Sequence, residues 1–164
     1  MAVRIIKILL VASIAAWGLV NGVGNLLYYD YWLNIVGFVM SVENVESEAA
    51  RAITNPLLHS IGYAFIYLPK FATGIFCGWG AYDLWRARRA TAEIFEKAKY
   101  RFYIGTGISI FMLIFGFLVM AGAFFNPGVM PSVFAQTFLS GVSVYLISIG
   151  VALLYVAIPE EKAK

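Results

Sequence analysis

The chain has 164 residues, of which 62% are hydrophobic and 13% are charged, and its formal net charge is +3 at pH 7. A soluble domain of this length cannot bury so much apolar surface in one core, so the excess must face lipid. The composition therefore excludes an ordinary soluble domain. The sequence also lacks a compact basic region of the kind that binds nucleic acid.

Four apolar windows are long enough to cross a membrane, because a spanning helix needs about 20 predominantly apolar residues. They cover approximately residues 5–28, 57–85, 102–125 and 138–158. The first window is too long for a typical signal-peptide core, so we interpret it as a retained helix. Spanning helices satisfy their own backbone hydrogen bonds, and the runs lack the alternation of barrel strands. We predict an all-α, integral membrane four-helix bundle forming one domain over residues 1–164.

Basic residues are distributed unevenly between the two predicted sides. They gather at the N-terminus, at the C-terminus and between the second and third windows, which places both termini in the cytoplasm by the positive-inside rule. The middle segment is also suited to anionic lipid headgroups, although topology alone would explain it. Its basic residues are Arg86, Arg88, Arg89, Lys97, Lys99 and Arg101. We expect this segment to extend the second or third helix.

The outer segment Asp30–Ser41 carries Trp32, Ile35, Val36 and Val39 at helical spacing. This pattern predicts an amphipathic helix on the outer membrane interface, with a docking face for a partner as the alternative.

Two further loop features are predicted. Ser47–Pro56 has the capping signals of a short helix, and Asn126–Thr137 contains the prolines and glycine of an irregular turn.

Small residues at four-residue spacing indicate close helix packing in membranes. The first helix has Gly18 and Gly22, and the second has Gly74 and Gly78. These pairs predict contact faces, either within the bundle or with other chains.

The sequence offers little chemistry for cofactors or catalysis. One histidine, His59, and one cysteine, Cys77, cannot supply a bis-histidine haem, a zinc site or an iron–sulfur ligand set. We therefore expect no cofactor, no metal and no catalytic residues. His59 is expected to form a hydrogen bond near the interface, and Cys77 to pack as a small apolar residue.

Lys70 is the one charged residue predicted near the membrane midplane, so it should face protein or water. Helical side chains lean toward their own N-terminus, which directs the ammonium outward. Pro69 leaves the Phe65 carbonyl without its helical donor, and Asn21 is expected at the level the ammonium reaches. The predicted polar intramembrane site consists of Asn21, Asn25, Tyr63, Tyr67 and Lys70. Its lysine is interpreted as structural, as half of an ion pair with another chain, or as part of a transport path.

Three segments resemble a family of bacterial predicted small integral membrane proteins of unknown function. They are MAVRIIKILLVASIAAWGLVNGVGNLLYYDY, RAITNPLLHSIGYAFI and CGWGAYDLWRARRA, at Met1–Tyr31, Arg51–Ile66 and Cys77–Ala90. The resemblance implies a multi-pass protein of the bacterial inner membrane, with no assigned activity.

These observations favour a non-catalytic accessory or assembly subunit of a larger bacterial inner-membrane complex, respiratory or photosynthetic, whose partners are other membrane subunits. The alternative is a small oligomeric transporter or channel that uses Lys70 in an anion or proton path. An enzyme is the third hypothesis, and we expect the chain not to be one.

Overall fold

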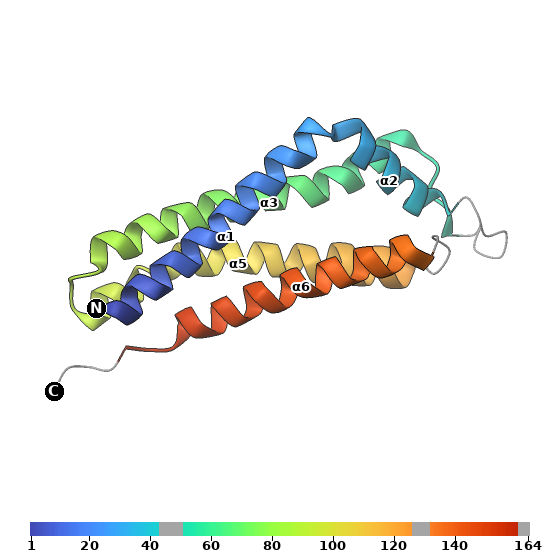
Figure 1. Cartoon of the computed structure of the whole chain (residues 1–164). Helices are drawn as coiled ribbons and strands as arrows, with labels where there is room; N and C mark the ends of the chain where they lie inside the picture. Colours follow the sequence, from blue (N-terminus) through green and yellow to red (C-terminus); the bar gives the residue numbers. More distant parts are fainter. Residues whose placement is uncertain (43–50, 126–131, 161–164) are drawn as a thin grey trace.

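Four long helices run alongside one another in the computed structural model, which describes residues 1–42, 51–125 and 132–160 (Figure 1). They are α1 (Ala2–Leu27), α3 (Pro56–Ala87), α5 (Tyr100–Phe111) with its π-helical continuation η2 (Met112–Phe124), and α6 (Ser132–Ala157). Each has a stretch long and apolar enough to cross a membrane. The predicted all-helical, four-span bundle is therefore confirmed.

The ends of the helices follow local sequence signals. At the start of α3 the Asn55 side chain accepts a hydrogen bond from the Leu57 amide, and Pro56 occupies the first turn, where its missing N–H costs nothing. The basic segment after α3 does not simply extend a neighbouring helix. Instead α3 ends at Ala87, the short helix α4 (Ala92–Lys97) follows behind a Thr91 cap, and α5 then begins.

The outer amphipathic segment forms α2 (Tyr29–Ser41), as its spacing predicts. The helix folds back along the first turns of α3 (Figure 1). A Cβ at Gly62 would lie 2.9 Å from the Met40 sulfur, so the two helices touch closely there. A ring nitrogen of His59, on α3, lies 2.6 Å from the Ile53 carbonyl oxygen, the kind of bond the sequence predicted.

The other loop predictions are only partly covered. Residues 43–50 of the predicted short helix and residues 126–131 of the predicted turn lie outside the described residues. The last part of the predicted helix, residues 52–55, is not helical. The fourth long helix begins at Ser132, earlier than the predicted 138, so it takes in residues assigned to the turn.

The backbones of α1 and α3 approach each other closely where the two helices cross. A Cβ at Gly18 would lie 2.7 Å from both the Lys70 carbonyl oxygen and the Gly74 amide nitrogen. One turn further along α1, a Cβ at Gly22 would lie 3.1 Å from the Phe71 ring, and one at Gly78 would lie 3.9 Å from the Ala15 Cβ. All four glycines predicted as packing residues thus lie at contacts within this chain.

Small residues also bring α3 against α5. A Cβ at Gly80 would lie 2.9 Å from the Phe102 amide nitrogen, and one at Gly105 would lie 2.6 Å from the Cys77 sulfur. Cys77 is completely buried in this contact. The hydroxyl of Thr73 donates a hydrogen bond across it to the Gly105 carbonyl, at 3.2 Å.

Candidate functional site

A cavity of about 590 Å³ lies among α1, α2, α3, η2 and α6. Its walls are mostly apolar. The face of α2 predicted to lie on the membrane interface, including Trp32, Val36 and Val39, forms one wall. Gly141 and Tyr145 of α6 contribute to another. The α2 face therefore points toward the interior of the bundle, where side chains from helices distant in sequence meet it.

Another part of the wall is the π-helical segment η2 (Met112–Phe124), which contributes Leu113, Gly116 and Met120. Helices of this kind have wider turns than an α-helix and occur frequently at functional sites. The Phe111 and Phe115 rings stack at its start, 5.4 Å apart and nearly parallel. The π-helical segment thus contributes both to the cavity wall and, through Met112 and Leu113, to the buried core.

Lys70 of α3 lines the cavity and is only half-buried. Its Nζ donates a hydrogen bond to the Asn25 side-chain oxygen at 3.3 Å. The Lys70 backbone packs against Gly18, whereas Asn25 lies seven residues further along α1, about 10 Å at 1.5 Å per residue. The ammonium therefore leans toward the α2 end of the bundle, the direction that the helix geometry predicts.

The structure brings together part of the predicted polar site. Asn25 is its centre, because its side chain accepts from Lys70 and its backbone carbonyl accepts from the Tyr63 hydroxyl at 2.7 Å. The Tyr67 ring lies 5.3 Å from that of Tyr63. Asn21 lines the cavity, but its side chain donates to the Trp17 carbonyl instead of meeting Lys70. The amide that contacts Lys70 is thus that of Asn25, which lies nearer the C-terminal end of α1 than Asn21 does.

Trp17 is a cavity residue that the sequence reasoning did not select. Its indole N–H is buried and has no hydrogen-bond partner among the described residues. The ring lies 5.2 Å from that of Tyr145, which also lines the cavity. A tryptophan within a long apolar run carries no distinguishing signal in the sequence, so its role depends on the packing of α1 against α6.

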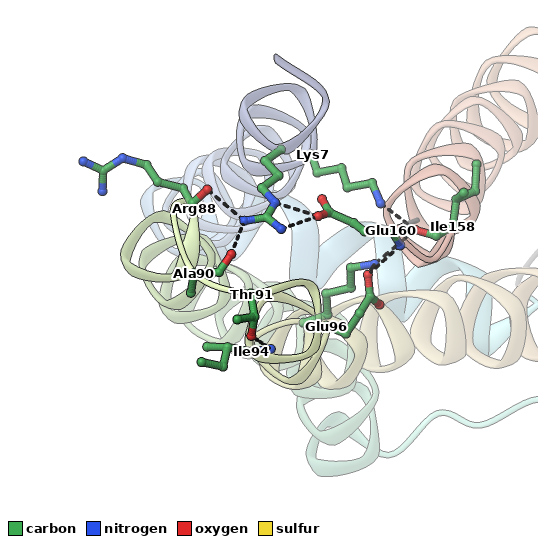
Figure 2. Close-up of polar contacts among 10 residues, drawn as sticks. Lys7, Arg88, Ala90, Thr91, Ile94, Glu96, Ile158 and Glu160 are labelled. Atoms are coloured by element: carbon green, nitrogen blue, oxygen red, sulfur yellow. Dashed lines mark hydrogen bonds and ion pairs between the residues drawn. The ribbon is translucent and has the colours of Figure 1, made fainter. Parts of the chain in front are cut away.

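A second polar cluster occupies the opposite end of the bundle, where the N-terminus and the last described residues meet (Figure 2). Arg4 forms an ion pair with Glu160 at 2.6 Å and donates to the carbonyls of Arg88 and Ala90. Its guanidinium also lies 4.8 Å above the Phe95 ring. One arginine thereby joins α1, the turn after α3, α4 and the segment after α6.

Two buried lysines in the same cluster hold the end of α6. Lys7 and Lys99 both donate to the Ile158 carbonyl, at 2.5 and 3.2 Å, and Lys99 also pairs with Glu96 at 2.7 Å. Glu96 in turn accepts from the Glu160 amide. Positive charge at the C-terminal end of a helix is favourable because the last carbonyls there lack helical donors. The sequence reasoning used Lys7 only for topology, and Lys99 for topology and for anionic headgroups.

Lys99 is therefore not available to lipid headgroups, although it belongs to the predicted basic set. Other members remain near the surface and contact aromatic rings: the guanidinium of Arg88 lies 4.1 Å from the Trp85 ring centre, and that of Arg86 lies 5.9 Å from Tyr82. Arg101 is paired with Asp83. Binding of anionic headgroups to this surface stays a proposal.

The described residues contain no group of three or more His, Cys, Asp or Glu side chains that could hold a metal ion. What the cavity presents to a bound molecule is an apolar surface with amine, amide and indole groups.

Comparison with known proteins identifies the family. Residues 3–159 match the family described as predicted small integral membrane protein (DUF2165). The chain belongs to this family. No curated protein and no solved structure matches it. The family description supports a multi-pass integral membrane protein and leaves the function of the chain to be inferred from the site.

Proposed function

We propose that the chain is a non-catalytic membrane protein that holds an amphiphilic molecule, taken from the membrane, in the cavity beside Lys70. The observation that carries this proposal is the cavity itself. Its volume, about 590 Å³, lies within the range of roughly 300–1,000 Å³ that is usual for ligand sites. Such sites have mostly apolar walls and a few polar groups that orient the ligand, which is the composition found here.

The apolar walls favour an amphiphile over a small hydrated ion. Ion paths are lined by rings of carbonyls or charged side chains that replace the hydration shell. In this cavity the amide and amine side chains, Asn21, Asn25 and Lys70, come from α1 and α3, while α2 and η2 present apolar surface. Among transport hypotheses, the geometry thus supports movement of a lipid-like anion more than conduction of an inorganic ion or proton.

The location of the cavity supports an exchange with one leaflet. Many of its lining residues belong to α2, and α2 lies at the end of the bundle away from the N-terminus (Figure 1). If the uneven distribution of basic residues sets the orientation, the N-terminal end is cytoplasmic and the cavity belongs to the outer half of the membrane. We place the protein in the bacterial inner membrane on this basis and on the family resemblance.

Two glycines of α6 provide a matched test. Gly141 lines the cavity and Gly150 does not, and a Cβ at either position would meet nothing within 4 Å. Gly141→Leu should therefore fill cavity space without a backbone clash, whereas Gly150→Leu adds the same side chain elsewhere. The protein, purified in mild detergent, would be titrated with long-chain alcohols and acids while tryptophan fluorescence is recorded.

Wild type and Gly150→Leu should bind alike, and Gly141→Leu should bind at least tenfold more weakly. Equal binding by the two leucine variants would contradict the proposal, as would the failure of wild type to bind any amphiphile. Organic extraction of the purified protein, followed by mass spectrometry, would identify what it carries from the cell.

The second candidate is an accessory or assembly subunit of a larger membrane complex. It is supported by the position of Lys70, which lines the cavity and donates a hydrogen bond to the neutral amide of Asn25. A carboxylate of another subunit would stabilise that ammonium in a membrane. Cross-linking from residue 70 in native membranes would capture a partner protein under this hypothesis, and capture only lipid under the first.

A further inference from the structure

We infer that the polar end of the ligand is an anionic oxygen group, a carboxylate or a phosphate, held by the Lys70 ammonium. This inference rests on the proposed function and adds the chemical class of the bound molecule. The juxtaposition that carries it is a single ammonium group beside neutral amides on the wall of a mostly apolar cavity.

The lysine has bonding capacity to spare. An ammonium has three N–H donors, and the hydrogen bond from Lys70 to the Asn25 side-chain oxygen is long, at 3.3 Å. Asn25 cannot supply a negative charge, and its backbone carbonyl already accepts from Tyr63. Within a membrane, a charged side chain needs an opposite charge or water close by, because the hydrocarbon cannot solvate it. An anionic headgroup entering the cavity would supply that charge.

The other polar cluster of the protein shows what a completed site looks like. At the N-terminal end Lys99 is wholly buried and pairs with Glu96, and Arg4 pairs with Glu160. Lys70 is the cation on the cavity wall, and its hydrogen bond goes to the Asn25 amide oxygen rather than to a carboxylate. At that end Arg4 and Lys99 thus meet carboxylates and Lys7 meets a carbonyl inside the protein, whereas Lys70 lines open space at the other end.

The experiment compares a long-chain carboxylic acid with the alcohol of the same chain length, using the full-length protein in nanodiscs of a neutral glycolipid that carries no phosphate. The alcohol tests whether the cavity takes an amphiphile, and the acid tests whether it prefers an anion. Wild type, Lys70→Met and Lys97→Met would be compared. Lys97 is the control, because it is exposed and lies in α4, away from the cavity.

Wild type and Lys97→Met should bind the acid about 10- to 100-fold more tightly than the alcohol, the range expected for a hydrogen-bonded charge. Lys70→Met should bind the alcohol as wild type does and lose the preference for the acid. Lys70→Arg should recover part of it. If Lys70→Met fails to fold, Lys70→Gln replaces it, with binding of the alcohol as the sign that the cavity is intact.

Each outcome has one meaning. An acid preference that persists without Lys70, or no preference in wild type, would overturn the inference while leaving the proposed function in place. Wild type that binds neither the acid nor the alcohol would overturn both. A second series with a phosphate-bearing lipid in the nanodisc distinguishes the sources: competition that depends on Lys70 identifies a lipid headgroup, and its absence, with the acid preference retained, identifies a free carboxylate.

Discussion

Replacing Gly18 by alanine tests the close crossing of α1 and α3, on which the position of Lys70 depends. The added Cβ would lie 2.7 Å from the Lys70 carbonyl oxygen and from the Gly74 amide nitrogen. Ordinary contacts begin near 3.4 Å, so the helices must separate by about 0.7 Å. Both obstructing atoms are backbone, so no side-chain rotation relieves the contact. Overpacking of this kind costs about 1–3 kcal/mol.

Gly24→Ala is the matched control, because it lies in the same helix and its Cβ would meet nothing within 4 Å. Both substitutions gain about 1 kcal/mol of helix propensity, and this gain cancels in the comparison. We expect Gly18→Ala to be less stable than Gly24→Ala by about 1–3 kcal/mol. The free energy of unfolding would be measured in mixed micelles titrated with a denaturing detergent. Equal stability of the two variants would refute the crossing geometry described here.

Three further predictions concern buried groups. Lys99→Met should destabilise the protein by about 1–3 kcal/mol, because Glu96 and the Ile158 carbonyl each lose a charged donor. Lys97→Met, in an exposed ion pair, should leave the free energy of unfolding unchanged within the error of the measurement. Thr73→Val should cost about 0.6 kcal/mol, the average for a hydrogen bond between membrane helices, and a cost above about 2 kcal/mol would show that the hydroxyl does more than bond Gly105. The Cys77 thiol should react with a membrane-permeant maleimide only after denaturation, because it is fully buried against α5; rapid labelling of the folded protein would contradict that packing.

Several features of this protein follow from local sequence. The four long helices do, because an uninterrupted run of about 20 apolar residues must satisfy its own backbone within lipid whatever its neighbours are. The helix α2 follows from its spacing, and the direction of the Lys70 side chain follows from the tilt of Cα–Cβ bonds along a helix. The α1 and α3 glycines are also visible in the sequence as small residues at four-residue spacing.

Only the tertiary structure decided which surfaces meet. Lipid tails are as apolar as the side chains that face them, so hydrophobicity does not mark the inner face of a membrane helix, and the partners of Gly18 and Gly74 depend on shape. For the same reason the sequence did not predict the cavity, whose walls come from five helices, or the place of Trp17 in its lining. The apolar face of α2 would suit lipid or protein equally, and the close approach at Gly62 placed it against protein. The cluster around Lys7 and Lys99 required the last residues of α6 to return beside α1, a contact that spans nearly the whole chain and leaves no periodic signal in the sequence.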